Sequence, residues 1–246
     1  MHGDLPDDDV GGKMAQPHDD GVRGVLFDVD GTLVDTNYLH TLAWWQAFRR
    51  FGHDVPMASI HRTIGMGGST LIEHLIGEGR DTGQDEELKD THGALFSAQW
   101  PAIRSFDGTR DLLNHCAEVG LAVVLATSAN NEELAVLKKV IDADDAITGA
   151  TTATDTGISK PSPDILEAAL GVGELKAEEA VFIGDAVWDV LAANKLGMRT
   201  IAVTTGGTSE AELRDAGAAY VFENVRELLN AVLAGEVPEL AKTTGG

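Results

Sequence analysis

The sequence predicts an α/β fold, in which a doubly wound parallel sheet carries an inserted α-helical domain. Two observations lead to this prediction. Short apolar runs of strand-forming residues alternate with segments of helical periodicity from residue 22 onward. One long stretch, 36–105, interrupts this alternation with helical patterns alone. Alternating strands and helices are typical of a parallel sheet whose two faces are both covered by helices.

Each element of the predicted core is a short segment bounded by turn residues. Gly120 and Gly197 stand where two of the helices are expected to end, because glycine readily adopts the conformation that closes many helices. The predicted strands are 22–27, 122–126, 146–147, 180–183, 200–203 and 219–222. The predicted helices are 108–119, 131–141, 163–170, 187–196, 209–216 and 225–233.

The domain organisation follows from where this alternation is interrupted. A core made of 21–35 and 106–234 is expected to carry an α-helical domain, 36–105, with helical patterns at 38–51 and 69–77. The insertion would then lie over the carboxyl edge of the sheet, where ligands bind in open α/β sheets. The acidic segment 1–20 is expected to be a disordered tail, and 235–246 a loose one.

Charge and cysteine content limit the partners and the compartment that we expect. Acidic residues outnumber basic ones 40 to 18, and the net charge of −22 repels nucleic acid and anionic membranes. No apolar run approaches the ~18 residues of a membrane span, and no signal-peptide pattern begins the sequence. The single cysteine, Cys116, cannot form an internal disulfide, so a reducing cytoplasm is the expected location.

The stretch VLFDVDGTLVD ends an apolar strand with two aspartates, Asp28 and Asp30, followed by Gly31. Aspartate is a poor strand former and close like charges repel, so folding alone does not favour this pair. Because side chains alternate along a strand, both carboxylates are expected to point to the same side. Two carboxylates at a sheet edge indicate a metal site, an acid–base pair, or a nucleophile with its acid.

Polar side chains also follow later elements of the predicted sheet. Thr127 and Ser128 come directly after the second strand, and Asp185 follows the fourth, with Asp189 one helical turn further. Lys160 lies in the proline-framed loop ISKPSPD. Carboxylates, a hydroxyl and one lysine at a common edge suit Mg²⁺ and a phosphoryl group.

With these residues the chain resembles the haloacid dehalogenase superfamily, in its capped phosphatase and phosphomutase branch. Four motifs of that family occur in order within residues 21–232. They are Asp28-Val29-Asp30-Gly31-Thr32, then Thr127, then Lys160, then Gly184-Asp185 with Asp189. The resemblance implies a Rossmann-like core, with the insertion 36–105 as an α-helical cap domain.

The resemblance also implies a role for each motif. Asp28 would attack phosphorus and form an aspartyl-phosphate, and Asp30 would protonate the leaving oxygen and then activate water. Thr127 and Lys160 would hold the phosphoryl oxygens. Mg²⁺ would be held by Asp28, the backbone carbonyl of Asp30 and Asp185, with Asp189 nearby or acting through water.

The residues that would select the substrate are less clearly marked. Ser128, which follows Thr127, is expected to share its role. His40 comes soon after the first motif, and Arg62 precedes the loop IGMGGST; these three are the candidate substrate-binding residues. A solvated surface charge is the alternative for Arg62. Trp44 and Trp45, at helical spacing, are more typical of a helix core than of a substrate contact.

The predicted function is Mg²⁺-dependent hydrolysis of a small phosphomonoester, such as a phosphorylated sugar or phosphoglycolate. Asp30 argues against carbon–halogen cleavage, whose enzymes lack the second aspartate. The absence of a lysine before Lys89 in the insertion argues against phosphonate cleavage. A β-phosphoglucomutase-like sugar phosphomutase is the alternative, although the loop Gly67-Gly68-Ser69 lacks the expected arginine, for which Arg62 would have to substitute.

Two further classes would use a similar set of residues. A phospho-accepting receiver-type signalling domain has a comparable acidic pocket, but it has no D-x-D-G-T motif and no long helical insertion. A binding module on an inactive hydrolase scaffold would not need the complete set of motifs.

Lys160→Ala is expected to weaken phosphate handling while the fold stays intact, because the residue is predicted to hold phosphoryl oxygens. Phosphate release and thermal unfolding measured on the same preparation test this. A variant that unfolds would make Lys160 a structural residue.

Overall fold

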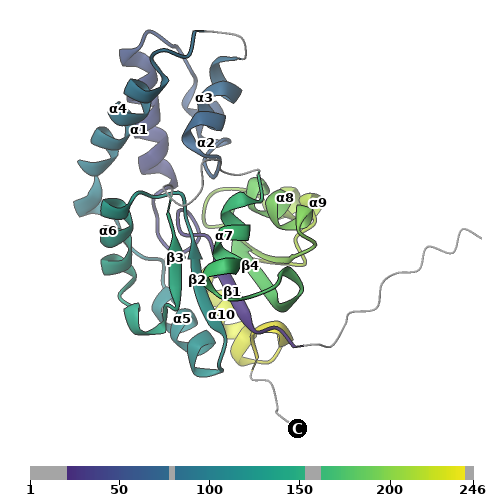
Figure 1. Cartoon of the computed structure of the whole chain (residues 1–246). Helices are drawn as coiled ribbons and strands as arrows, with labels where there is room; N and C mark the ends of the chain where they lie inside the picture. The colour runs from purple at the N-terminus through teal and green to yellow at the C-terminus, as the bar shows by residue number, and fades with distance from the viewer. Residues whose placement is uncertain (1–20, 78–80, 153–161, 242–246) are drawn as a thin grey trace, which may run out of the picture.

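The computed structural model describes residues 21–77, 81–152 and 162–241, which form a six-stranded sheet with helices on both faces (Figure 1). Every neighbouring pair of strands is parallel, and the strand order is β3-β2-β1-β4-β5-β6. The chain therefore builds the sheet outward from β1 on one side, and outward from β4 on the other. The strands are β1 (Gly24–Phe27), β2 (Ala122–Ala126), β3 (Gly149–Thr151), β4 (Ala180–Gly184), β5 (Arg199–Val203) and β6 (Tyr220–Phe222).

Successive side chains of a strand enter different hydrophobic clusters, so both faces of the sheet are covered. In β1, Val25 and Phe27 pack in one cluster while Leu26 packs in another. Helices α5, α6 and α10 contribute to the first cluster, and α7 and α8 to the second. This arrangement confirms the predicted doubly wound α/β fold. The core helices are α5 (Thr109–Glu118), α6 (Asn131–Ile141), α7 (Asp164–Val172), α8 (Val187–Lys195), α9 (Glu210–Ala216) and α10 (Val225–Leu233).

The first four α-helices described after β1 lie together at one end of the sheet, whereas α5, which follows them before β2, packs against the sheet (Figure 1). We call α1 to α4 the helical insertion. It has a hydrophobic cluster of its own, in which Trp44, Phe48 and Ile60 are buried. Trp44 is thus a core residue of the insertion. The helices are α1 (Asn37–Arg50), α2 (Met57–His61), α3 (Gly68–Ile76) and α4 (Asp85–Ser97).

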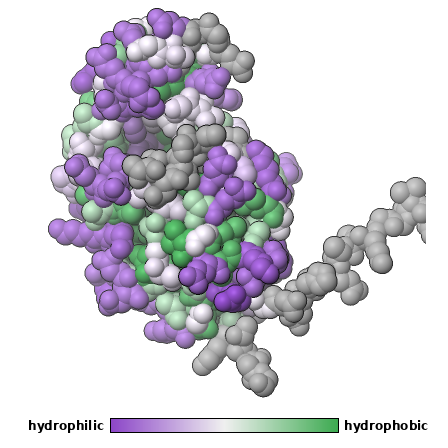
Figure 2. Space-filling view, viewed as in Figure 1, coloured by the Kyte–Doolittle hydropathy of each residue, from purple (hydrophilic) through white to green (hydrophobic). Residues whose placement is uncertain are grey.

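The surface is mostly polar where the insertion is exposed. On the face drawn in Figure 2, hydrophilic residues cover much of the insertion, and more hydrophobic residues gather over the part that contains the sheet. Among the described residues, no helix is both long and apolar enough to cross a membrane.

The predicted strand 146–147 is wrong. Ala146 ends a 3-10 turn, η2 (Asp144–Ala146), and β3 begins only at Gly149. The apolar signal has another cause, because Ala146 is buried against the helix-covered core and Ile147 packs beside it. Pairing with β2 starts at Thr148, whose N–H donates to the carbonyl of Val123 at 2.8 Å.

The prediction of a loose tail from residue 235 onward is wrong for its first part. Val237 and Leu240 are fully buried in the main core cluster, on either side of the start of the 3-10 turn η4 (Pro238–Leu240). Their three-residue spacing places both on one side of a helical turn. Residues 242–246, like the predicted tail 1–20, lie outside the described residues.

Leu228→Ala should destabilise the protein by about 2–5 kcal/mol, because Leu228 is fully buried and truncation leaves a cavity in the main core. The matched control is Leu233→Ala on the same helix, α10, where the side chain is 63% exposed and the expected change is within about 0.5 kcal/mol. Urea unfolding of the two variants measures both. Equal losses would contradict the assignment of this helix face to the core.

Candidate active site

The candidate site lies where the chain changes direction in the sheet, between β1 and β4. The two strands are in register from Gly24↔Ala180 to Phe27↔Ile183, and the next N–H, that of Asp28, donates to the carbonyl of Ile183 at 2.8 Å. Asp28 and Asp185 therefore emerge from the carboxyl ends of adjacent strands. In doubly wound sheets this switch point is where ligands bind.

Three carboxylates meet at this point. Asp28, Asp185 and Asp189 each place an oxygen within 4.8 Å of the others, and their residues are only 7%, 2% and 1% exposed. The Thr32 hydroxyl lies between two of them, 3.1 Å from Asp28 Oδ2 and 3.0 Å from Asp185 Oδ1. The Asn37 amide donates to Asp185 Oδ2 at 2.9 Å. We call Asp28, Asp185 and Asp189 the carboxylate triad.

Close backbone approach makes glycine necessary beside the triad. A Cβ on Gly206 would overlap the Asp185 carboxylate and the Asn37 amide. Gly31, with φ +80°, turns the chain after Asp30 and would likewise collide with Asn37 if it carried a side chain. Both positions therefore let α1 and the loop after β5 close on the triad.

The triad fits a Mg²⁺ ion. Burying three carboxylates whose oxygens lie within 4.8 Å of one another is unfavourable unless hydrogen bonds and a cation compensate the charge. Asp189 is itself oriented, because its Oδ2 accepts from the backbone N–H groups of Asp185 and Ala186 at 3.1 and 3.0 Å. Carboxylate oxygens are the protein ligands that Mg²⁺ prefers.

Asp30 belongs to a different cluster. Its Oδ1 accepts a hydrogen bond from the Thr36 hydroxyl at 2.6 Å and lies 3.2 Å from His40 Nε2. Glu133 of α6 completes this cluster, with Oε1 3.7 Å from the same nitrogen. The two aspartates of the first motif are thus set among different neighbours, Asp28 in the carboxylate triad and Asp30 against a histidine.

The other predicted site residues of the core are Thr127, Ser128 and Lys160. Thr127 is 2% exposed, and its hydroxyl accepts from the Ala129 N–H at 3.1 Å, while Ser128 is exposed. Neither residue caps α6, because the N-cap is Asn130, whose side chain accepts from the N–H groups of Glu132 and Glu133. Lys160 lies outside the described residues.

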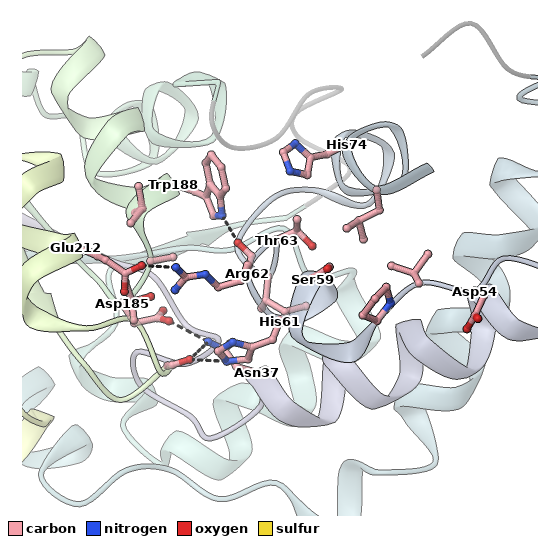
Figure 3. Close-up of a pocket in the computed structure, with 18 residues that line it drawn as sticks. Asn37, Asp54, Ser59, His61, Arg62, Thr63, His74, Asp185, Trp188 and Glu212 are labelled. Carbon is pink, nitrogen blue, oxygen red and sulfur yellow. Dashed lines mark hydrogen bonds and ion pairs between the residues drawn. The ribbon is translucent and has the colours of Figure 1, made fainter. Parts of the chain in front are cut away.

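The two substrate-binding candidates from the insertion are both engaged with the protein. His40 is only 9% exposed and lies against Asp30. The guanidinium of Arg62, at the end of α2, pairs with Glu212 of α9 (Figure 3). This pair raises the pKa of Arg62, and the same hydrogen bond, with those from Ser209, lowers the pKa of Glu212 to about 2. Arg62 thus links the insertion to the core.

A cavity of about 590 Å³ separates the end of α2 from the core and reaches Asp185 (Figure 3). Two hydrogen bonds cross beside it: Trp188 Nε1 donates to the carbonyl of Arg62 at 3.0 Å, and His61 Nε2 lies 3.0 Å from the carbonyl of Gly206. Polar and apolar side chains line it in similar measure, as is usual for a site that binds a small molecule. Those labelled in Figure 3 include Ser59, His61, Thr63, His74 and Trp188.

Burial and charge shift the pKa values around Asp30. Burial raises the pKa of Glu133 to about 7, although nearby His40 opposes this. Burial would lower the pKa of His40, but the carboxylates of Asp30 and Glu133 outweigh it, and the pKa is raised. The pKa of His92 is well below its ordinary value, because it is buried and faces the positive charge of His40.

Several residues of the site were not among the sequence candidates: Thr36, Asn37, His92 and Glu133. Thr32 was noted as part of the first motif, and its hydroxyl bridges Asp28 and Asp185. Thr36 and Asn37 could have been found from the sequence, because they stand at the start of the first helix after the motif. His92 and Glu133 carried no local signal, because only folding brings them to His40.

Glu133→Gln should stabilise the metal-free protein at pH 8 but hardly at pH 5. The folded-state pKa, about 7, lies above the ordinary value of 4.5, so the folded state holds the proton more tightly. The free energy of unfolding of the wild type therefore falls as pH rises between these values, by on the order of 1–3 kcal/mol. Glu133→Gln has no carboxyl group that can ionise at this position, so its free energy of unfolding does not fall in this way.

Urea unfolding at the two pH values, with chelator present, measures this difference. The matched control is Glu132→Gln at the exposed neighbouring position, which keeps Glu133 and should therefore keep the wild-type fall in stability between the two pH values. A variant that is destabilised at pH 8 would mean that ionised Glu133 is a net stabilising group.

Comparison with known proteins places this geometry in a family. Residues 25–203 match the haloacid dehalogenase-like hydrolase family. Protein SUPPRESSOR OF QUENCHING 1, chloroplastic, of Arabidopsis thaliana is 29% identical over 87% of this chain, which spans only 21% of that longer protein. Phosphoglycolate phosphatase 1 of Pseudomonas aeruginosa is 28% identical, over 84% of this chain and 78% of its own length.

A solved structure agrees with this match. The crystal structure of a hydrolase from Pseudomonas syringae superposes with a TM-score of 0.81 and 31% identity, covering 89% of this chain and 99% of that one. The predicted resemblance is therefore confirmed: the chain belongs to the haloacid dehalogenase-like hydrolase family.

Proposed function

We propose that the protein is a Mg²⁺-dependent phosphatase that hydrolyses a small phosphomonoester through an aspartyl-phosphate. The observation that carries the proposal is the division between two clusters. Asp28 lies in a buried carboxylate triad suited to a cation, and Asp30, two residues on, lies in a hydrogen-bonded cluster suited to moving a proton. A nucleophile and a proton donor at one switch point are what phosphoryl transfer to a carboxylate requires.

In the first step, an oxygen of Asp28 attacks phosphorus as the bond from phosphorus to the ester oxygen breaks. The carboxyl group of Asp30 gives its proton to the departing oxygen, which leaves as an alcohol. In the second step, Asp30 takes a proton from a water whose oxygen attacks the same phosphorus. The bond between phosphorus and Asp28 then breaks, so inorganic phosphate leaves and both carboxyl groups return to their starting states.

The residues that would hold Mg²⁺ are Asp28, the backbone carbonyl of Asp30, Asp185 and Asp189. When bound, the ion neutralises charge that would otherwise keep an anionic nucleophile from an anionic phosphate. The Thr127 hydroxyl already accepts a hydrogen bond, so its proton can be donated to a phosphoryl oxygen. Lys160 is assigned the same task from its motif alone. Ser128, the exposed residue that follows Thr127, is the further candidate for contact with the phosphoryl group.

The substrate we propose is small, because the cavity beside Asp185 measures about 590 Å³ and is bounded by the insertion. We take segment 36–105 to be a cap domain that closes over the carboxyl edge of the sheet. A relative named phosphoglycolate phosphatase makes phosphoglycolate a first substrate to test, together with phosphorylated sugars. The net charge of −22 disfavours nucleic acid and anionic membranes, and the cytoplasm remains the proposed location.

The decisive assay is phosphate release from phosphoglycolate, β-glucose 1-phosphate and glucose 6-phosphate, each with Mg²⁺ and with chelator. Mg²⁺-dependent release of free phosphate from one compound would support the proposal. Conversion of β-glucose 1-phosphate to glucose 6-phosphate with little free phosphate would instead identify a sugar phosphomutase. No turnover of any compound with Mg²⁺ present would contradict the proposal for this substrate class.

Asp28→Asn should abolish turnover, because the amide is a poor nucleophile and the triad loses a charge. With p-nitrophenyl phosphate, whose leaving group departs without a proton, Asp30→Asn should stall the reaction at the aspartyl-phosphate, because hydrolysis then lacks its base; general acid–base assistance is typically worth about 10²–10⁴ in rate. Mass spectrometry of acid-quenched Asp30→Asn protein measures the trapped phosphoenzyme.

The matched control is Asp35→Asn, a change at an exposed aspartate of the same stretch, which should keep wild-type turnover. Appreciable activity in Asp28→Asn would exclude the covalent route.

A further inference from the structure

A stack of four aromatic rings joins the helical insertion to Asp30. In order, the rings are those of Phe96, His40, His92 and Trp44, with centroid separations of 3.8, 5.3 and 4.1 Å between successive rings. Helix α1 supplies His40 and Trp44, and α4 supplies His92 and Phe96, in both cases four residues apart. Each helix thus places one histidine and one apolar ring on the face that meets the other helix.

The stack leaves His40 little freedom to turn. The residue is 9% exposed, and Phe96 covers a face of its ring, nearly parallel to it at 16°, while His92 meets the Nδ1 edge of the ring with its plane tilted by 25°. His92 is in turn held by Trp44, at 11° to its own plane. The position of the His40 ring is therefore set by both helices, which lie side by side in Figure 1.

Both nitrogens of His40 are hydrogen-bonded. Nε2 lies 3.2 Å from Asp30 Oδ1, which also accepts from the Thr36 hydroxyl; with Oδ1 as acceptor, Nε2 carries a proton, and the proton that Asp30 donates to the leaving oxygen is carried by Oδ2. Nδ1 lies 3.2 Å from His92 Nε2, so one of these two nitrogens donates to the other. A continuous hydrogen-bonded chain thus runs from His92 of α4, through His40 of α1, to the carboxylate of Asp30.

The core contributes one further group to this chain. Oε1 of Glu133, on α6, lies 3.7 Å from His40 Nε2, on the same side as Asp30. The imidazole therefore faces carboxylates of the core at one nitrogen and the insertion at the other. On the Asp30 side, the Thr36 hydroxyl at 2.6 Å gives the carboxylate a second donor.

We propose that His92 is a positioning residue, which holds Asp30 in the orientation for protonating the leaving oxygen by fixing His40 between them. The inference rests on the proposed role of Asp30 as the proton donor. His92 reaches Asp30 through His40, which is hydrogen-bonded to His92 at Nδ1 and to Asp30 at Nε2. Proton transfer by Asp30 therefore depends on the position of α4 against α1, because small misplacements of a catalytic group lower the rate strongly.

The leaving group provides a specific test. An alkoxide must be protonated as it departs, whereas p-nitrophenolate leaves without help, so only the alkyl ester needs a well-placed Asp30 in the first step. The quantity to measure is kcat/KM, which reports the steps up to departure of the leaving group. Its values are compared for p-nitrophenyl phosphate and for the alkyl phosphate that the wild type hydrolyses fastest in the panel above.

The informative variant is His92→Phe, which keeps a ring in the stack and removes the hydrogen bond to His40. We expect kcat/KM for the alkyl phosphate to fall about tenfold or more, part of the general-acid effect, while that for p-nitrophenyl phosphate falls at most about twofold. His92→Gln, which keeps a hydrogen-bonding group, should recover part of the loss. The control His53→Phe alters a histidine of the insertion that contacts Phe48 and lies outside the stack.

Three outcomes would overturn the inference. Equal losses on both substrates would show a general structural role, and thermal unfolding of each variant would reveal it independently. No loss on the alkyl phosphate would show that the histidine chain does not position Asp30. Absence of Mg²⁺-dependent turnover by the wild type on every substrate would overturn the proposed function, and this inference with it.

Discussion

The structure depends on the burial of three carboxylates at the carboxyl ends of β1 and β4. Close negative charges are unfavourable in a protein interior, so their surroundings are specialised to hold them. Thr32 bridges Asp28 and Asp185, and Asn37 donates to Asp185 from the first turn of the insertion. Gly206 is required because any side chain there would occupy the space of the carboxylate. The first helix of the insertion and the loop after β5 are thus both anchored at the same acidic point.

The short turn after β1 separates the tasks of two aspartates that are almost adjacent in the chain. Asp28 joins the buried triad, whereas Asp30 is held by Thr36 and His40 at the start of the insertion. The insertion meets the core on two sides of the site: the histidine chain ends on Asp30, and the Arg62–Glu212 pair with the Trp188 hydrogen bond ties the end of α2 to α8 and α9. The residues proposed to carry out the chemistry are therefore physically connected to the contacts that hold the insertion against the core.

Local signals explain how much of this was predictable. The bounds of β2, α6 and α10 agree with the prediction, because apolar periodicity and N-caps at Asn130 and Asn224 mark such elements within a few residues. The prediction of a strand at 146–147 failed because a short apolar pair buried at a turn has the same sequence pattern as a short buried strand. Asp28, Thr127 and Asp185 were found because each directly follows a strand.

The contacts that complete the site were not predictable in this way. His40 and His92 are 52 residues apart, and Arg62 and Glu212 are 150 apart, so nothing in either local sequence marks the pairing. Arg62 looked free to meet a substrate because its ionic partner is supplied by a distant helix. Such pairs arise from how α1, α4 and α9 pack, which depends on the whole fold rather than on one segment.

Calorimetric titration of Mg²⁺ into the metal-free protein, beside Asp185→Asn, tests the central claim most directly. If the buried triad is a cation site, the wild type binds one Mg²⁺ ion and is stabilised by it, and the variant binds more than about tenfold more weakly. Absence of saturable binding to the wild type, or equal binding to both proteins, would contradict the account.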